Sequence, residues 1–272
     1  MSFTILGGSG FVGSHLAARL RAAGEEVFTP ERDDDAYLGR ELGHVVYCIG
    51  VTSDFRSRPL DTVDAQVTTL MPLLRRGRFE SLLYLSSTRV YRRGADGRET
   101  ATLSLRADVS DDLYNVSKLM GEAVCLASGR PAARVARVSN VYGDGMSPKS
   151  FLGAVLSDAV GMARIQFEST LDSCKDYLSL DDLLGLLPRI AATGRHRLYN
   201  VASGINVTNG ELSALISRLT KCRASVAADA CLSVFPQIPI DRVQREFGFA
   251  PARLEHRLPP LIEALRRGTV AA

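Results

Sequence analysis

Phe3-Thr4-Ile5-Leu6-Gly7-Gly8-Ser9-Gly10-Phe11-Val12-Gly13 is the stretch that decides the fold. Its first four residues predict a short buried strand, and a helical pattern with Leu16 and Leu20 on one face follows the glycines. Glycines at 7, 10 and 13 allow a tight turn, close approach of a pyrophosphate and close packing of helix on strand. The start of the helix supplies free N–H groups for the phosphates. The stretch therefore predicts dinucleotide binding, although a glycine-rich turn of this kind can also be purely structural.

Strands alternate with helices over the first half of the chain. Short apolar runs at 27–29, 45–49, 82–85 and 135–138 predict strands, and helices are predicted around 61–74 and 110–128. Pro72 should kink or shorten the first of these helices, and Ser110-Asp111-Asp112 is typical of a helix cap. Apolar strands that alternate with helices favour a parallel sheet covered on both faces. The predicted fold class is α/β, a Rossmann-type doubly wound parallel sheet with a smaller, mixed C-terminal substrate lobe.

The regular alternation weakens after residue 145. Helices are predicted near 149–163, 180–192, 209–220 and 258–267, with short strands at 165–167 and 198–201. We expect residues 1–145 to form a dinucleotide-binding domain, to which the chain returns near 175–202. Residues 146–272 are expected to form mainly a substrate-binding lobe.

Composition excludes several classes of protein. The 272 residues are 46% hydrophobic and 23% charged, which excludes disorder, collagen and coiled coil. No apolar run suits a membrane span, and the N-terminus lacks a signal-peptide pattern, so a cytoplasmic protein is expected. The net charge of +3 is small, and the basic residues are spread along the chain, which argues against nucleic-acid binding. The five cysteines form no CxxC pair and the four histidines have no ligand spacing, so no metal site is predicted.

Two further segments place candidate catalytic and substrate-binding residues at the predicted sheet. Tyr114 and Lys118 are four residues apart on a predicted helix and share one face. A phenol is a poor base at neutral pH, but a nearby ammonium and the positive nicotinamide stabilise its phenolate. The same pair also fits a surface aromatic beside a solvated lysine. Ser87 and Thr88 follow the strand predicted at 82–85, at the edge where ligands bind in α/β sheets, although serines there also simply form turns.

Four later segments complete a set of motifs that covers nearly the whole chain. They are Arg137–Gly143, Lys175–Asp182, Tyr199–Gly204 and Gly248–Pro251. With the glycine stretch and the Tyr114–Lys118 pair, they resemble the motifs of the extended short-chain dehydrogenase/reductases, the NAD-dependent nucleotide-sugar epimerase/dehydratase family. The resemblance implies an enzyme with NAD or NADP as cofactor, a nucleotide-activated sugar as substrate and a homodimeric state.

The resemblance also implies roles for individual residues. Ser87 would bond the sugar oxygen whose carbon exchanges hydride, Tyr114 would be the acid or base on that oxygen, and Lys118 would hold the nicotinamide ribose. Substrate contacts are expected from Ser87, Thr88 and, at the diphosphate, Asn140. The expected cofactor contacts are Gly7, Gly10, Phe11, Val12, Gly13, Glu31, Arg32, Tyr114 and Lys118.

The sequence departs from the family pattern at several places. The segment between Arg32 and His44 is too short for the usual third strand, and Arg92 and Lys175 replace a glycine and an arginine. The family's dehydratases place an Asp-Glu pair after the catalytic hydroxyl, where this chain has Thr88 and Arg89. Neither residue is a plausible acid or base, so elimination is disfavoured. Epimerisation through a keto intermediate or reduction of a keto sugar is predicted. The alternative is a non-catalytic dinucleotide-binding sensor or assembly subunit of the same fold.

The choice between NAD and NADP depends on two neighbouring residues. Glu31 is expected to end the second strand, where a carboxylate would bond the adenosine ribose hydroxyls and repel a 2′-phosphate. Arg32 could instead pair with that phosphate, and either residue could be a solvated loop charge. NAD is weakly favoured.

Overall fold

The computed structural model describes residues 1–32, 34–51 and 54–268. Its largest sheet, over this part of the chain, has six parallel strands in the order β2-β1-β3-β4-β5-β9. Its inner strands are buried on both faces, which explains their nearly continuous apolar sequences. The strands are β1 (Ser2–Leu6), β2 (Glu26–Phe28), β3 (His44–Tyr47), β4 (Ser81–Ser87), β5 (Ala133–Val138) and β9 (Leu198–Val201). The predicted α/β fold class is confirmed.

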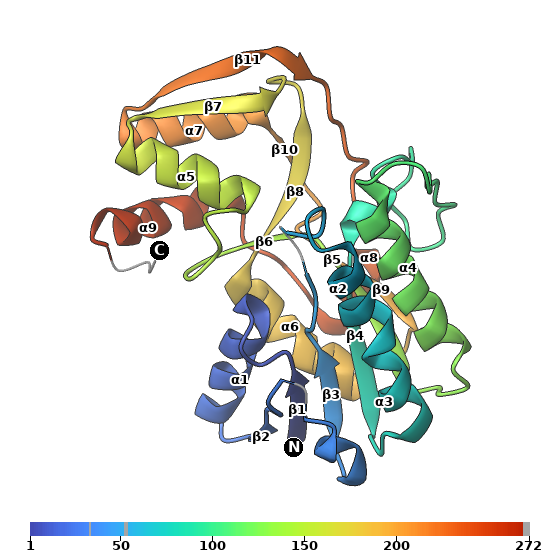
Figure 1. Cartoon of the computed structure of the whole chain (residues 1–272). Coiled ribbons are helices and arrows are strands. Elements are labelled where there is room, and N and C mark those ends of the chain that lie inside the picture. Colours follow the sequence, from blue (N-terminus) through green and yellow to red (C-terminus); the bar gives the residue numbers. More distant parts are fainter. Residues whose placement is uncertain (33, 52–53, 269–272) are drawn as a thin grey trace.

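Helices cover both faces of this sheet (Figure 1). Leu16 of α1 and Leu187 of α6 belong to the core cluster on one face, and Leu73 of α3 and Cys125 of α4 to that on the other. The bounds are α1 (Phe11–Ala22), α2 (Pro59–Val63), α3 (Leu70–Arg76), α4 (Asp112–Ala127) and α6 (Leu180–Thr193). Among the described helices, none combines the length and apolar character that crossing a membrane requires.

The main sheet ends at β2, which is an edge strand. Described residues 34–43 contribute no strand to this sheet and hold the short 3-10 helix η1 (Ala36–Gly39), so the expected loss of the usual third strand is confirmed. The expectation that Glu31 ends the second strand is wrong, because β2 already ends at Phe28. Pro30 has no N–H to donate to a ladder, which keeps the strand from continuing to Glu31.

The helix predicted over 61–74 is interrupted. The π-helical segment η2 (Asp64–Thr68) separates α2 from α3, and Pro72 lies in the first turn of α3. A missing N–H costs little there, whereas in a continuous helix the proline ring would clash with the carbonyl of residue 68. The helix continues past Pro72 to Arg76, so the proline does not shorten it at its end, and the irregular segment lies before the proline instead.

The start of α4 differs from the predicted cap. The helix begins at Asp112, and its N-cap residue Asp111 makes no capping hydrogen bond through its side chain. Arginines hold both carboxylates instead: Arg92 donates to Asp111 at 2.8 Å and Arg93 to Asp112 at 2.7 Å. A charge-assisted bond to a guanidinium is stronger than a bond to a backbone amide, which explains the outcome.

A second group of elements lies beyond the carboxyl ends of the main-sheet strands (Figure 1). It contains a mixed three-stranded sheet, β10-β8-β6, and a parallel pair, β11-β7, with a hydrophobic core of its own. The sequence did not predict β6, β8, β10, β11 or α8. The bounds are β6 (Asn140–Tyr142), α5 (Phe151–Gly161), β7 (Arg164–Ser169), β8 (Cys174–Ser179), β10 (Asn206–Thr208), α7 (Asn209–Thr220), β11 (Arg223–Cys231) and α9 (Leu254–Arg266). Helix α8 (Asp241–Phe247) lies beside β9 instead, and its Val243 and Phe247 belong to the core of the main sheet.

Candidate active site

The residues with predicted chemistry gather at the carboxyl edge of the main sheet. Gly7 follows β1, Gly50 lies beyond the end of β3, and Ser87 is the last residue of β4. A Cβ atom on Gly7 would lie 2.9 Å from the carbonyl carbon of Cys48, so the glycine turn touches the segment that follows β3. Parallel strands end at the same edge of a sheet, which is where open α/β sheets bind ligands.

The glycine turn between β1 and α1 is built for an anion. Gly7 has a φ of +83°, and a Cβ on Gly13 would lie 2.2 Å from the Gly7 carbonyl oxygen. Gly10 is the N-cap of α1, without a capping side chain and with no acidic residue in the first turn. A Cβ on Gly10 would meet a single neighbouring atom within 4 Å, the Gly7 oxygen at 3.4 Å. The open space and unpaired amides at this helix start fit the pyrophosphate of a dinucleotide.

The other expected cofactor contacts differ in their placement. The Phe11 ring packs edge-on against His15 at 5.5 Å, and Val12 packs against the main core. Their backbone amides, at the start of α1, are thus the groups left for a phosphate. Glu31 and Arg32 are exposed beyond β2 and form no hydrogen bond or ion pair with the residues that the structure describes.

Ser87, Tyr114 and Lys118 come together as predicted. The pKa of Tyr114 responds to a hydrogen bond with the Ser87 side chain. The Lys118 Nζ lies 5.8 Å from the centre of the Tyr114 ring and donates to the Leu85 carbonyl at 2.7 Å. Tyr114 is 7% exposed and Lys118 5% exposed. Phenol, hydroxyl and ammonium therefore form one compact, nearly dry site.

Burial dominates the protonation of this site. It raises the pKa of Tyr114, and the Ser87 hydrogen bond and the Arg89 charge partly oppose the rise. It lowers the pKa of Lys118 to about 7, although the Glu122 carboxylate acts in the opposite direction. Added positive charge beside the phenol would favour its phenolate form. The site on its own thus holds a neutral phenol beside an ammonium that releases its proton easily.

The buried ammonium gives a testable effect on stability. We expect Lys118→Met, which keeps the shape of the side chain, to have a larger free energy of unfolding than the wild type near neutral pH, because the substitution removes a buried charge. The folded-state pKa of Lys118, about 7, lies below its ordinary value of 10.5, so between these values the unfolded chain binds more protons. The wild type should therefore gain stability as pH rises from about 7, by at most about 1.4 kcal/mol per pH unit relative to the variant. Urea unfolding without added dinucleotide at several pH values measures this, and a pH-independent difference would contradict it.

Two site residues were missed by sequence reasoning. Phe55 is buried, and its ring lies 5.4 Å from that of Tyr114. The Arg89 guanidinium lies 5.2 Å from the Phe55 ring and 5.9 Å from the Tyr114 ring, and its backbone N–H donates to the Ser87 Oγ at 3.2 Å. Phe55 lies in a segment without a periodic pattern. The closeness of Arg89 to Ser87 in sequence was the signal that could have found it.

A further feature lies beside Lys118. The amide nitrogen of Gln66 is buried and has no hydrogen-bond partner among the described residues. A Cβ on Gly50 would lie 3.1 Å from this nitrogen and 3.6 Å from the Lys118 Nζ. Because residue 50 is a glycine, there is room beside two donors, the unpaired amide nitrogen of Gln66 and the charged Nζ of Lys118. This space fits a polar group of a bound cofactor.

The two remaining expected substrate contacts do not join the reaction centre in the same way. Thr88 is buried in η3 (Thr88–Tyr91), the 3-10 turn after Ser87. The Asn140 side chain donates to the backbone oxygen of Asp176 at 2.8 Å, a bond that joins β6 to β8. This bond supports the small sheet, and the role of Asn140 at a diphosphate stays a prediction.

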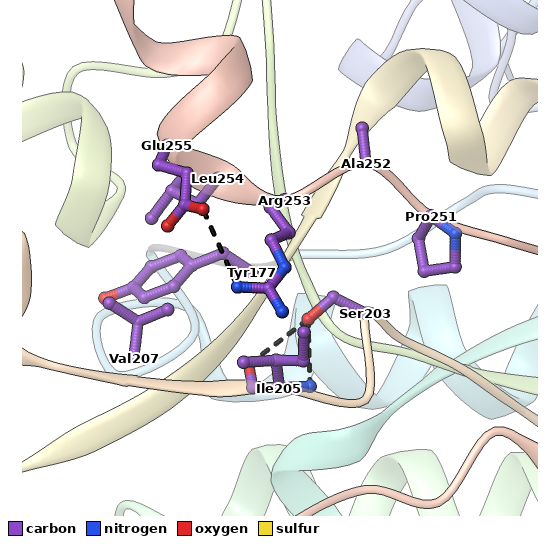
Figure 2. Close-up of a pocket in the computed structure, with 9 residues that line it drawn as sticks. All are labelled: Tyr177, Ser203, Ile205, Val207, Pro251, Ala252, Arg253, Leu254 and Glu255. Carbon is purple, nitrogen blue, oxygen red and sulfur yellow. Dashed lines mark hydrogen bonds and ion pairs between the residues drawn. The ribbon is translucent and has the colours of Figure 1, made fainter.

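A separate pocket lies in the second group of elements. It has a volume of about 390 Å³, part of it open to solvent, and is lined by Tyr177, by residues of the segment 203–207 and by residues 251–255. Figure 2 shows the ion pair between Arg253 and Glu255, 3.6 Å apart, in this pocket. None of the predicted site residues lines it, so it is not the reaction centre. Over the described residues, no group of three or more His, Cys, Asp and Glu side chains could hold a metal ion.

Known proteins resemble this chain in sequence and in fold. The sequence profile of the NAD dependent epimerase/dehydratase family matches residues 3–202. A UDP-glucose 4-epimerase from Thermotoga maritima has the same fold, with a TM-score of 0.81 and 16% identity over 99% of this chain and 100% of that one. A UDP-glucuronic acid 4-epimerase from Bacillus cereus gives 0.80 and 14% over 98% and 99%. TunA, an NAD-dependent NDP-hexosamine 5,6-dehydratase of tunicamycin biosynthesis, gives 0.82 and 20% over 98% of both chains. No curated protein sequence matches the chain.

The family profile extends from β1 to the end of β9 and so contains the glycine turn, Ser87, Tyr114 and Lys118. It confirms the resemblance drawn from the motifs, and with it the predictions of an enzyme and of a nicotinamide dinucleotide as cofactor. The chain belongs to the NAD dependent epimerase/dehydratase family.

Proposed function

We propose that the protein is an NAD(P)-dependent epimerase or keto-sugar reductase that acts on a nucleotide-activated sugar. The observation that carries the proposal is the convergence of Ser87, Tyr114 and Lys118 beside the glycine turn, at one edge of the main sheet. The names of the structural neighbours support the substrate class, since they include complexes with UDP-glucose and UDP-glucuronic acid.

Each catalytic side chain has a task that follows from its position. Tyr114 transfers a proton to or from the sugar oxygen, and the neighbouring Ser87 hydroxyl orients that oxygen. Lys118, anchored on the Leu85 carbonyl, supplies positive charge beside the phenol and donors for the nicotinamide ribose. When bound, the dinucleotide supplies the hydride step. The low exposure of the site excludes water from the reacting carbon.

The residues beside Ser87 argue against elimination of water. Thr88 is buried, and Arg89 donates its backbone N–H to Ser87 while its guanidinium faces Tyr114. A guanidinium stays protonated at physiological pH and cannot take a proton from a sugar carbon. Neither residue can therefore act as the acid or base of an elimination, and Tyr114 as proton-transfer group suffices for oxidation and reduction at a single carbon.

Product mass tests the proposal. The protein is incubated with NAD or NADPH and UDP-glucose, and the product is followed by mass spectrometry and reduced-nicotinamide absorbance. A new species of unchanged mass that separates from the substrate on chromatography indicates epimerisation. A gain of two hydrogens, when a keto sugar is supplied with the reduced cofactor, indicates reduction. A product that has lost one water, or the absence of any product from nucleotide sugars, would contradict the proposal.

The preference for NAD is a prediction about Glu31 and Arg32. If Glu31 accepts the ribose hydroxyls, Glu31→Ala should weaken NAD binding and relieve repulsion of NADP. If Arg32 clamps a 2′-phosphate, Arg32→Ala should weaken NADP and leave NAD almost unchanged. One charge-assisted hydrogen bond is worth about ten- to a hundredfold in affinity. We expect the Glu31 pattern, and titration calorimetry of both cofactors against the wild type and each variant measures it. A wild type that binds NADP about tenfold more tightly than NAD would contradict it.

A further inference from the structure

Three arginines beside the reaction centre share one carboxylate. Arg56, Arg89 and Arg92, here called the arginine cluster, contact Asp111 at 2.5, 3.5 and 2.8 Å respectively. Among the described residues, Asp111 is the acidic group paired with this cluster. One carboxylate neutralises only one of three guanidinium groups, so the cluster keeps an excess of positive charge.

Arg89 is the least satisfied member of the arginine cluster. Its side chain is 27% exposed, its contact with Asp111 is the longest of the three, and its Nε is buried without a hydrogen-bond partner. Burial and the charges of Arg92 and Arg56 lower the pKa of Arg89, and Asp111 only partly opposes them. A partly buried guanidinium with open donors is stabilised by an anion that pairs with its fork.

Lys175, on β8, adds a cation from the second group of elements. Burial and the charges of Arg89 and Arg92 lower the pKa of Lys175 to about 8. Its Nζ lies 3.4 Å from the centre of the Phe151 ring, and it repels the arginine cluster although it is distant from it in sequence. Positive charge therefore borders the reaction centre from both the main sheet and the small mixed sheet.

The position of Arg89 decides which part of a substrate the cluster meets. Its guanidinium lies 5.9 Å from the Tyr114 ring, and its backbone N–H donates to the Ser87 Oγ at 3.2 Å. Under the proposed function, on which this inference rests, Ser87 and Tyr114 hold the oxygen of the reacting sugar carbon. We take the reacting carbon to be C4, which is next to C5 and distant from the anomeric carbon that carries the diphosphate. A substituent at C5 is then nearer to Arg89 than the diphosphate.

We propose that the arginine cluster, with Arg89 as its centre, binds a carboxylate carried by the sugar ring, so that the substrate is an acidic nucleotide sugar. The planar guanidinium of Arg89 pairs with both carboxylate oxygens through two parallel N–H donors, and Arg56 and Arg92 add charge at its rim. The pairing also fixes the face of the ring that is turned toward Tyr114.

Two sugars that differ in a single group test this site. UDP-glucose and UDP-glucuronic acid differ at C6, where one has a hydroxymethyl group and the other a carboxylate. We expect the wild type, saturated with NAD, to bind the acid about tenfold or more tightly than the neutral sugar in titration calorimetry. Arg89→Gln should lose this preference, so that the ratio of its affinities for the two sugars falls to about one. Arg98→Gln is the matched control and should keep the preference, because Arg98 is exposed and its ion-pair partner among the described residues is the nearby Asp96.

Arg56→Gln provides a second variant, because the Arg56 side chain is 54% exposed and its replacement leaves no gap in the core. It should reduce the preference for the acid in part. Equal affinity of the wild type for both sugars would overturn the inference and leave the proposed function intact. An equal loss for both sugars in Arg89→Gln would assign the anion site to the diphosphate and overturn the inference as well. Failure of the wild type to bind either sugar would overturn the proposed function together with the inference.

Discussion

Tyr114→Phe is expected to lower turnover by about 10²- to 10⁴-fold, the usual effect of removing a general acid or base. The affinity for the dinucleotide should stay within about twofold of the wild type, because only the hydroxyl is lost. The phenyl ring keeps its contact with Phe55, 5.4 Å between ring centres, so the site retains its shape. Steady-state kinetics and titration calorimetry of the same preparation separate the two quantities.

Tyr142→Phe is a matched control for this variant. Tyr142 is also buried, but its hydroxyl finds no hydrogen-bond partner in the described part of the chain. Removing that hydroxyl should leave turnover and stability unchanged or slightly raise stability. Near-normal turnover in Tyr114→Phe would remove Tyr114 from the mechanism, whatever the control shows.

Gly10→Val is expected to abolish dinucleotide binding in a protein that still folds. The Cβ atom of the added side chain meets only the Gly7 oxygen within 4 Å, at 3.4 Å, so the free protein leaves space at this position. The backbone at Gly10 is extended, with φ −80° and ψ 168°, a conformation that valine adopts readily. The space it fills is the space that a pyrophosphate needs at the start of α1. Calorimetry with NAD and circular dichroism measure the two effects.

Gly13→Val gives the contrasting result. Its Cβ would lie 2.2 Å from the Gly7 carbonyl oxygen, which belongs to the backbone and cannot move without opening the turn. We expect this variant to lose the fold along with the dinucleotide. Unchanged dinucleotide affinity in folded Gly10→Val would place the phosphate site elsewhere.

The sequence was sufficient for the parts of the site that are local. Each element of the main sheet has an apolar run or a helical period of its own, and the glycine turn and the Tyr114–Lys118 pair are contiguous motifs. The carboxyl edge of a parallel sheet then brings them together by topology alone. Glu31 was misplaced because a propensity for strand does not reveal where Pro30 stops a ladder.

The parts that could not be predicted depend on contacts between distant residues. β6 and β10 are each three residues long, too short for a periodic signal, and are defined by pairing with β8. Asp111 resembled a helix cap, and its contacts with arginines, including Arg56 from 55 residues earlier in the chain, show its other use. Charge pairs of this kind leave no spacing pattern along the sequence.

The last strand of the main sheet has a consequence for how the chain is made. β9, which pairs with β5, and α6, which covers one face, follow the residues that form most of the second group of strands. A nascent chain that stops near residue 145 exposes the hydrogen-bonding edge of β5 and the apolar face that Leu187 later covers. Such an edge is a template for pairing with other chains. Synthesis on the ribosome must therefore pass residue 201 before the open edge of β5 is covered by β9. A fragment that ends near residue 145 should aggregate.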